Sequence, residues 1–288
     1  MSGPERPGAG SAARPDGFPA AVAAAVAAAD LAAGSQAALT VTGVDGCAAG
    51  WVAVTLGPPV TGLVGPGGPT DPEAAAALAG AVPADGPLVV KVTVAATLDL
   101  LPLAAVTGID MPLGLLGTGW RDADRLARRA LGRRGVTVFA IPPRAVWQCQ
   151  SYAEANRLCR ELTGKGFSAQ AWGLRRKIIE ADQFRRRTAA GPHEVRLYEV
   201  HPELSFAALA GAPLPDTKHT PAGLAVRRDL LTRTGITLPP RVAGAAEDDL
   251  LDAVAVAWSA RRIAAGTAVT LTGRDQPADD ETQIAIRY

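Results

Sequence analysis

Hydrophobic and polar positions repeat along this chain with two different periods, and the period predicts where strands and helices lie. Short β-branched and apolar runs that stop at Gly, Pro or Asp predict strands, whereas apolar positions three and four apart predict helices. The strands expected on this basis are 39–45, 51–56, 88–94, 105–110, 195–200 and 283–288. The helices expected are 97–103, 202–209, 220–232 and 248–265, the last with Leu251, Val254, Ala255 and Trp258 at helical spacing.

The order of these elements predicts an α/β fold built on a mixed sheet flanked by helices. A hairpin comes first, and strands separated by helices follow it. Residues 116–192 fall between the fourth and fifth strands and are mostly helical in pattern. We therefore expect one domain over residues 38–288, with a helical insertion at about 116–192. Residues 1–37 are rich in Ala, Gly and Pro, so a disordered leader is expected there.

Charge is distributed unevenly along the chain. The net charge is only +1, but residues 121–187 contain 16 Lys and Arg against 6 Asp and Glu, a local excess of 10 positive charges. Such a basic segment could bind a phosphate backbone, so nucleic acid is the expected partner. The alternative is a solvated helix face, which is the usual explanation for a run of charges. The candidate contacts in this segment are Arg133, Arg134, Arg175, Arg176 and Lys177.

Cysteine usage and hydropathy indicate the compartment. The three cysteines are odd in number and lack metal-ligand spacing, which favours a reducing environment and argues against a disulfide framework. No apolar run approaches the length of a membrane span. A cytoplasmic protein without a membrane partner is therefore expected.

Acidic residues stand where three expected elements meet loops. Asp45 ends the first strand, Asp110 ends the fourth, and Asp248, Asp249 and Asp252 lie at the start of the last helix. A carboxylate at the end of a buried strand is costly unless a cation meets it. Mg²⁺ prefers carboxylate, phosphate and water oxygens, and a pair of such ions can activate water against a phosphodiester. The spacing therefore predicts a site for Mg²⁺ or Mn²⁺.

Each of these aspartates also has a structural explanation when it is taken alone. Asp248 or Asp249 could cap the helix, and Asp110 could be a turn residue before Met111-Pro112. Asp252 lies too deep in the helix to cap it. The combination, rather than any single residue, favours metal binding.

Four sequence blocks resemble the signature of the domain-of-unknown-function 429 family, whose members are described as predicted RNase H-like nucleases. The blocks are Gly43-Val44-Asp45-Gly46-Cys47 with Gly50-Trp51, Gly108 to Leu115, Tyr198 to Phe206, and Asp248 to Ala253. Shorter matching pieces include Pro142-Pro143-Arg144, Lys177-Ile178 and Lys218-His219-Thr220. The similarity runs in order from about residue 38 to residue 288.

The resemblance implies an RNase H-like fold with its catalytic acids on the first strand, the fourth strand and the last helix. Asp45, Asp110, Asp249 and Asp252 match those places, as catalytic residues and as metal ligands. The last helix is also similar to the Asp-x-x-Asp-Ala helix of RuvC-type resolvases, which favours Asp249 over Asp248.

Further site residues are expected at the end of the fifth strand and in the basic segment. Glu199 could be another metal ligand, and His201 could carry a proton, because an unperturbed histidine has a pKa of about 6.5. The alternative for His201 is a buried histidine bonded to backbone, ahead of a helix that starts at Pro202. The candidate substrate contacts are Arg133, Arg134, Arg144, Lys177, His201 and Lys218.

These expectations support one function and leave two alternatives. The first is a metal-dependent phosphodiester hydrolase, a nuclease of the RNase H-like kind. The second is a non-catalytic nucleic-acid-binding or regulatory protein on the same fold. The third and weakest is an actin-like kinase, since Asp45-Gly46 after the first strand is similar to a phosphate-binding turn. Pro112 counts against the kinase, because proline removes an amide donor from the second loop such an enzyme needs.

Overall fold

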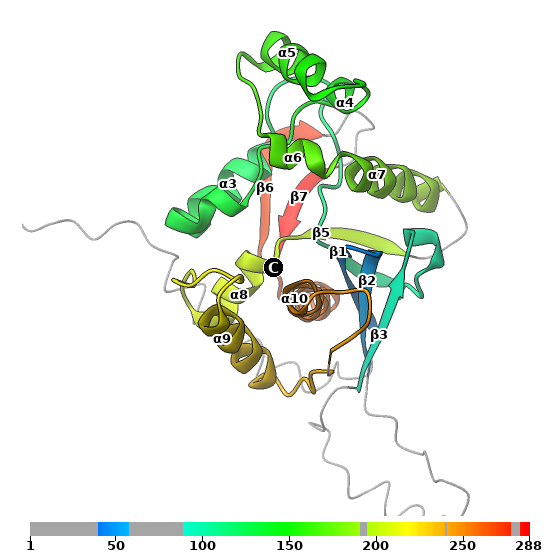
Figure 1. The fold of residues 1–288 in the computed structure, drawn as a ribbon, viewed down its shortest axis with the longest axis vertical. Coiled ribbons are helices and arrows are strands. Elements are labelled where there is room, and N and C mark those ends of the chain that lie inside the picture. Colours follow the sequence, from blue (N-terminus) through cyan, green and yellow to red (C-terminus); the bar gives the residue numbers. More distant parts are fainter. Residues whose placement is uncertain (1–39, 58–88, 191–194, 240, 278–282) are drawn as a thin grey trace, which may run out of the picture.

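The computed structural model describes residues 40–57, 89–190, 195–239, 241–277 and 283–288 (Figure 1). Within these ranges the chain forms a mixed seven-stranded sheet with helices packed on it, which confirms the α/β fold. The strands run in the order β3-β2-β1-β4-β5-β7-β6. The leader expected at residues 1–37 lies outside the described residues.

The strands of this sheet differ in direction as well as in order. Their bounds are Val41–Cys47 (β1), Gly50–Gly57 (β2), Val89–Ala95 (β3), Val106–Ile109 (β4), Arg196–Val200 (β5), Thr270–Pro277 (β6) and Gln283–Arg287 (β7). Strands β1, β4, β5 and β7 are parallel to one another, whereas β2, β3 and β6 each pair antiparallel with a neighbour. The parallel set is therefore the centre of the sheet, and its strands end at one edge.

The helices fall into three stretches of the chain. Their bounds are Asp122–Leu131 (α3), Arg144–Trp147 (α4), Tyr152–Thr163 (α5), Ala169–Gly173 (α6), Arg175–Ala190 (α7), Pro202–Ala210 (α8), Pro221–Thr232 (α9) and Glu247–Ala264 (α10). Helices α3 to α7 lie between β4 and β5, where helical structure is expected. Two short 3₁₀ helices are Leu98–Leu100 (η2) and Gly132–Thr137 (η3).

Two elements differ from the sequence expectation. The helix predicted at 97–103 is only the 3₁₀ turn η2, because Pro102 follows it closely and prevents its continuation. Strand β6 is not expected at all. Its sequence contains Gly273 and Pro277, residues that weaken a strand pattern, and its pairing with β7 is irregular.

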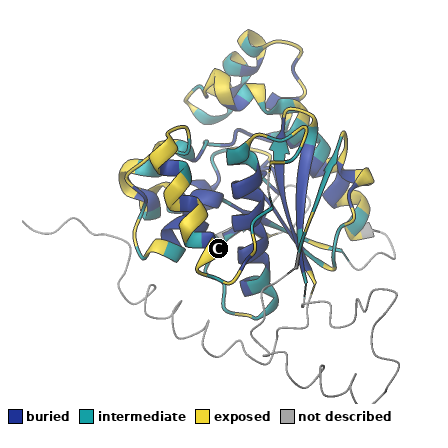
Figure 2. Ribbon diagram, turned by 60° about the horizontal axis from the view of Figure 1, so that its bottom comes forward, coloured by how far each residue is buried: buried dark blue, intermediate teal, exposed yellow. Residues whose placement is uncertain are grey.

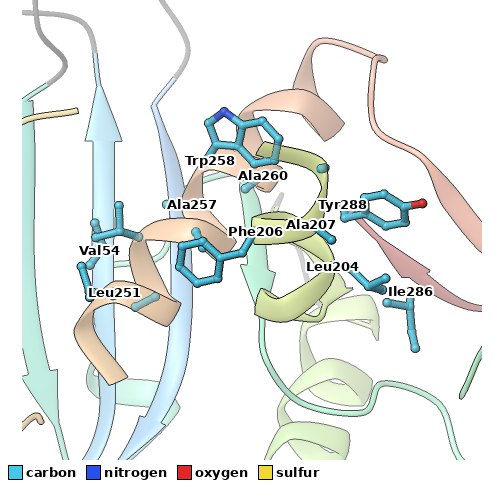
Figure 3. Packing of buried hydrophobic residues seen from close by; sticks show 14 of the residues in the cluster. Val54, Leu204, Phe206, Ala207, Leu251, Ala257, Trp258, Ala260, Ile286 and Tyr288 are labelled. Carbon is cyan, nitrogen blue, oxygen red and sulfur yellow. The ribbon is translucent and has the colours of Figure 1, made fainter. Parts of the chain in front are cut away.

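Two hydrophobic cores cover the two faces of the sheet. On one face, Leu251 and Ala257 of α10 lie against Val54 of β2, and Phe206 points from α8 toward α10 (Figure 3). On the other face, Val44 and Ile109 of the sheet pack with residues of α4 to α7. Figure 2 shows α10 and the central strands buried along most of their length.

Helix α10 lies unusually close to the sheet because two strands carry glycine beneath it. A Cβ at Gly43 would collide with the backbone nitrogen of Ala257 and the backbone oxygen of Ala253. A Cβ at Gly108, which pairs with Gly43 across β1 and β4, would lie 2.8 Å from Val256 Cγ1. The two glycines therefore bring the backbone of α10 into contact with β1, which contains Asp45, and with β4, which Asp110 directly follows.

Among the described residues, no helix combines the length and the apolar character that a bilayer crossing requires.

Candidate metal centre

Asp45, within β1, and Asp110, directly after β4, lie side by side. The parallel register pairs Val44 with Ile109, and the backbone N–H of Asp110 donates to Val44 O at 2.9 Å, which continues the pairing by one residue. Side chains alternate between the faces of a sheet. Asp45 and Asp110, two residues beyond Gly43 and Gly108, therefore point to the face that α10 covers.

Asp252 approaches the same point from α10. It lies one helical turn before Val256 and one residue before Ala253, which contacts β1 at Gly43. One oxygen from each of Asp45, Asp110 and Asp252 lies within 4.8 Å of the others. Asp45 and Asp252 are buried, and Asp110 is half-buried. The predicted meeting of the first strand, the fourth strand and the last helix is thus found.

The donor set fits a small divalent cation. All three groups are carboxylates, the hard oxygen ligands that Mg²⁺ and Mn²⁺ take. Two oxygens on opposite sides of one Mg²⁺ are about 4.2 Å apart, since each metal–oxygen bond is about 2.1 Å. The 4.8 Å limit is therefore within small side-chain rotations of a shared ion.

Burial of three like charges strongly perturbs their pKa values. Loss of hydration raises the pKa of Asp45 well above its usual range, and the carboxylates of Asp110 and Asp252 raise it further. Burial likewise raises the pKa of Asp110 to about 7 and that of Asp252 to about 7, with Lys218 acting in the opposite direction on both. The cluster therefore favours any cation that replaces protons.

Lys218 is the basic side chain that meets these carboxylates. It lies on the loop between α8 and α9, and its Nζ donates to Asp252 Oδ2 at 2.6 Å. The same nitrogen lies 3.5 Å from Asp248 Oδ2. Burial lowers the pKa of Lys218, but the carboxylates of Asp252, Asp45 and Asp110 outweigh it and raise that pKa. Lys218 is therefore charged.

A cavity of about 230 Å³ opens beside the carboxylates. Its polar lining includes the carboxylates, and its apolar lining comes from the segments after β4, after η3 and before α7, and from β5 and β7. The lining residues include Asp45, Asp110, Asp249, Lys218, His201, Lys177, Val138, Phe139 and Leu174. A substrate group that reaches the carboxylates would therefore also touch aromatic and basic side chains.

Asp249 lies at the cavity but has a contact of its own. Its Oδ2 accepts a hydrogen bond of 3.3 Å from the backbone N–H of Ala246, so it caps the first turn of α10. It does not belong to the group of three carboxylates that converge. Its predicted role as a metal ligand stays a prediction.

Glu199 lines the same cavity but lies on the other face of the sheet from the three aspartates, and its role as a metal ligand stays a prediction. It pairs with Ile109 in the sheet, and Ile109 faces the opposite side from Asp110. Its oxygens accept from the Arg121 guanidinium at 2.5 Å and from the backbone N–H of Leu113 at 2.7 Å. Because side chains alternate along a strand, the sequence alone could have predicted that Glu199 and Asp110 lie on opposite faces of the sheet. The sequence pattern does not predict that Arg121 is the buried partner of Glu199.

The basic residues proposed as substrate contacts differ in their partners and in their exposure. Arg134 pairs with Glu203 at 3.3 Å and Arg144 with Asp182 at 2.5 Å. Lys177 passes over Gly46, and its Nζ donates to the backbone oxygens of Cys47 and Gly50. Arg133, by contrast, is exposed on η3. Of these four residues, Arg133 is the exposed one, whereas the other three are half-buried.

His201 lies at the end of β5 and lines the cavity. Burial lowers its pKa, with Glu203 acting in the opposite direction, so the imidazole is neutral near pH 7. Its backbone oxygen accepts from the N–H groups of Leu204 and Ser205 at the start of α8, while its Nδ1 has no hydrogen-bond partner. The helix start at Pro202 is confirmed, and the role of the ring as a proton carrier stays a prediction.

The fold and the centre together define a class of protein: a mixed α/β sheet whose first strand, fourth strand and last long helix bring three carboxylates to one point. The family model described as "Protein of unknown function (DUF429)" matches residues 43–277. The chain therefore belongs to the domain-of-unknown-function 429 family, as its sequence blocks indicate. No curated protein and no solved structure matches it.

Proposed function

We propose that this protein is a metal-dependent phosphodiester hydrolase, a nuclease of the RNase H-like kind that uses Mg²⁺ or Mn²⁺. The observation that carries the proposal is the convergence of Asp45, Asp110 and Asp252 within 4.8 Å, beside a cavity that also holds basic side chains. Three converging carboxylates with raised pKa values are a costly arrangement, and metal-assisted hydrolysis is a function that requires it.

In this proposal some side chains bind the ion and others contact the substrate. Asp45, Asp110 and Asp252 would hold the ion at the end of the sheet. When bound, such an ion lowers the pKa of water and stabilises charge on a phosphoryl oxygen. Lys218 would place a fixed positive charge on the side of Asp252, and Phe139 would present an aromatic surface to a sugar or base.

Nucleic acid is the proposed substrate, bound partly through exposed basic groups such as Arg133. A reducing, cytoplasmic compartment is part of the same proposal. Cys47, Cys149 and Cys159 are all free and buried, which is compatible with it.

The direct test is Asp45→Asn, which keeps the shape of the side chain and its hydrogen bond from the Gly46 N–H. We expect a loss of about 10³-fold in cleavage of labelled single-stranded RNA, single-stranded DNA or RNA–DNA hybrid, equivalent to about 4 kcal/mol of activation free energy. Circular dichroism and thermal unfolding should show an intact fold.

The matched control is Asp229→Asn, on the exposed surface of α9, which should cleave as the wild type does. Cleavage by Asp45→Asn within about tenfold of wild type would contradict the assignment.

A second candidate function is a non-catalytic nucleic-acid-binding or regulatory protein. The ion pair between Lys218 and Asp252 favours it, because this pair already neutralises part of the acidic cluster without a metal. Calorimetry separates the two. If neither Mg²⁺ nor Mn²⁺ binds at millimolar concentration, the carboxylates are structural and the second function is the better one.

A further inference from the structure

Lys218 lies where a cation is needed and is held there by its own loop. Its ammonium group donates to Asp252 at 2.6 Å, is 3.5 Å from Asp248, and has only 28% of its side chain exposed. Because an ammonium group has three N–H donors, it can keep Asp252 and still turn a donor toward the cavity that it lines.

The loop that carries Lys218 is fixed on both sides of it. Thr217 O accepts from the backbone N–H of Thr220 at 3.2 Å and from its hydroxyl at 3.1 Å. The absence of a side chain at Gly223 lets α9 approach Thr217 O closely. The buried Arg227 donates to Asp216 O at 3.2 Å and also bonds Glu203 at 2.5 Å. The contacts of its loop therefore hold Lys218 at the site, unlike a lysine on a freely moving surface segment.

The charges at the centre balance with one divalent ion. Asp45, Asp110 and Asp252 carry three negative charges when ionised, and Lys218 offsets one of them. One Mg²⁺ or Mn²⁺ neutralises the remainder. A second divalent ion would leave excess positive charge at a buried point, and Asp249, a further carboxylate that lines the cavity, is bonded to the Ala246 N–H.

We propose that Lys218 takes the place of a second metal ion, so that the centre binds a single divalent cation and uses the lysine ammonium as its other positive charge. This inference rests on the proposed function, and it identifies Lys218 as a residue that touches the substrate phosphate. Asp252 Oδ2 would stay with Lys218, which would leave the other oxygen of Asp252 for the ion. The ammonium would then stabilise charge on a phosphate oxygen on the side away from the metal.

The test is a titration of the full-length protein with Mn²⁺, followed by calorimetry and by electron paramagnetic resonance. We expect the wild type to bind one ion per chain, with the spectrum of a mononuclear Mn²⁺. Lys218→Met keeps an unbranched side chain one atom shorter and removes the charge, so the first ion should bind about tenfold tighter or a second should bind as well. Lys218→Arg should resemble the wild type in the number of ions bound.

Lys165→Met is the matched control, since it makes the same substitution at an exposed lysine on the loop after α5 and should change nothing. Two ions in the wild type, with exchange-coupled Mn²⁺ signals, would overturn the inference and leave the proposed function standing. Unchanged or weaker binding by a folded Lys218→Met variant would do the same. If neither the wild type nor Lys218→Met binds an ion, both the inference and the proposed function are wrong.

The wild-type spectrum does not depend on any variant, so the inference remains testable if Lys218→Met does not fold.

Discussion

At the residue scale, Asp45, Asp110 and Asp252 carry more negative charge than Lys218 offsets, and this imbalance determines how the protein responds to pH. An unfolded aspartate has a pKa of about 3.9. In the folded protein the pKa of Asp110 and that of Asp252 are both raised to about 7. Between these values the folded state holds protons that the unfolded state has released. Its stability is therefore greatest at the acid end of this window and falls as the pH rises through 7.

We predict that the free energy of unfolding in the presence of a chelator falls by a few kcal/mol between about pH 5 and pH 8. Saturating Mg²⁺ or Mn²⁺ should reduce that fall, because the ion replaces the protons and binds only the folded state. Urea denaturation at the two pH values, with and without metal, measures both effects. Asp110→Asn should flatten the dependence, and a flat profile for the metal-free wild type would argue against the raised pKa values.

The positions of side chains that follow from local geometry could be predicted from the sequence. Asp45 lies near the end of β1 and Asp110 directly follows the adjacent parallel strand β4, while Asp252 lies too deep in its helix to cap it, so their convergence could be predicted. Partners that are distant in sequence could not. Lys218 reaches Asp252 across 34 residues, and Arg121 reaches Glu199 across 78. Neither ion pair can be predicted from the hydrophobic periodicity of the sequence.

At the scale of elements, the approach of α10 to β1 at Gly43 determines whether the three carboxylates can meet. A side chain at position 43 would strike the backbone of α10, not a flexible side chain that could move aside. The helix would have to shift outward and carry Asp252 with it.

Gly43→Ala is therefore predicted to destabilise the protein by about 3 kcal/mol or more, as overpacking of a rigid core does. Chemical denaturation measures the change, and metal binding should weaken in the same variant. Gly57→Ala, at the end of β2, is the matched control, because its new Cβ would meet only Thr40 Oγ1 at 3.4 Å. Equal stability for the two variants would show that α10 adjusts freely.

Elements with a strong pattern were predicted well, and those with a weak pattern were not. Strand β1 and helix α10 have long apolar runs, and they begin and end within two residues of the expected positions. Strand β6 contains Gly273 and Pro277, and it exists because β7 offers it an edge to pair with. β6 forms because of its tertiary contact with β7, and the sequence of β6 by itself does not show that contact.

At the scale of the whole molecule, many basic side chains of the segment between Arg121 and Arg187 already have partners within the chain. Most of the Lys and Arg side chains between Arg121 and Arg187 bond to carboxylates or backbone oxygens of this chain, as Arg144 does to Asp182 and Arg175 to Trp147 O. The local excess of positive charge therefore overstates what is available to a phosphate backbone. Exposed groups such as Arg133 remain as candidates.

We predict that nucleic-acid binding has a shallow salt dependence, with a slope of log K against log salt no steeper than about −3, because few phosphates can be contacted. Arg133→Ala should lower affinity without changing thermal stability. Arg134→Ala, one residue away, should instead lower stability, since it removes a partner of the buried Glu203. Fluorescence anisotropy at several salt concentrations and thermal unfolding distinguish the two, and a steep slope would indicate a wider contact surface than the one described.

The path of the chain after α10 constrains how the centre can respond to a ligand. Beyond the helix, Val269 and Tyr288 exchange backbone hydrogen bonds of 2.8 and 3.1 Å, and β7 pairs with β5. The helix that carries Asp252 is thus tied to the sheet by the strands that follow it, as well as by its own contact with β1. Helix α10 therefore cannot rotate as a rigid body about one of its ends. The entropic cost of binding an ion or a phosphate therefore falls on a few side-chain rotations, that of Lys218 among them, because the elements that carry the centre are already in place.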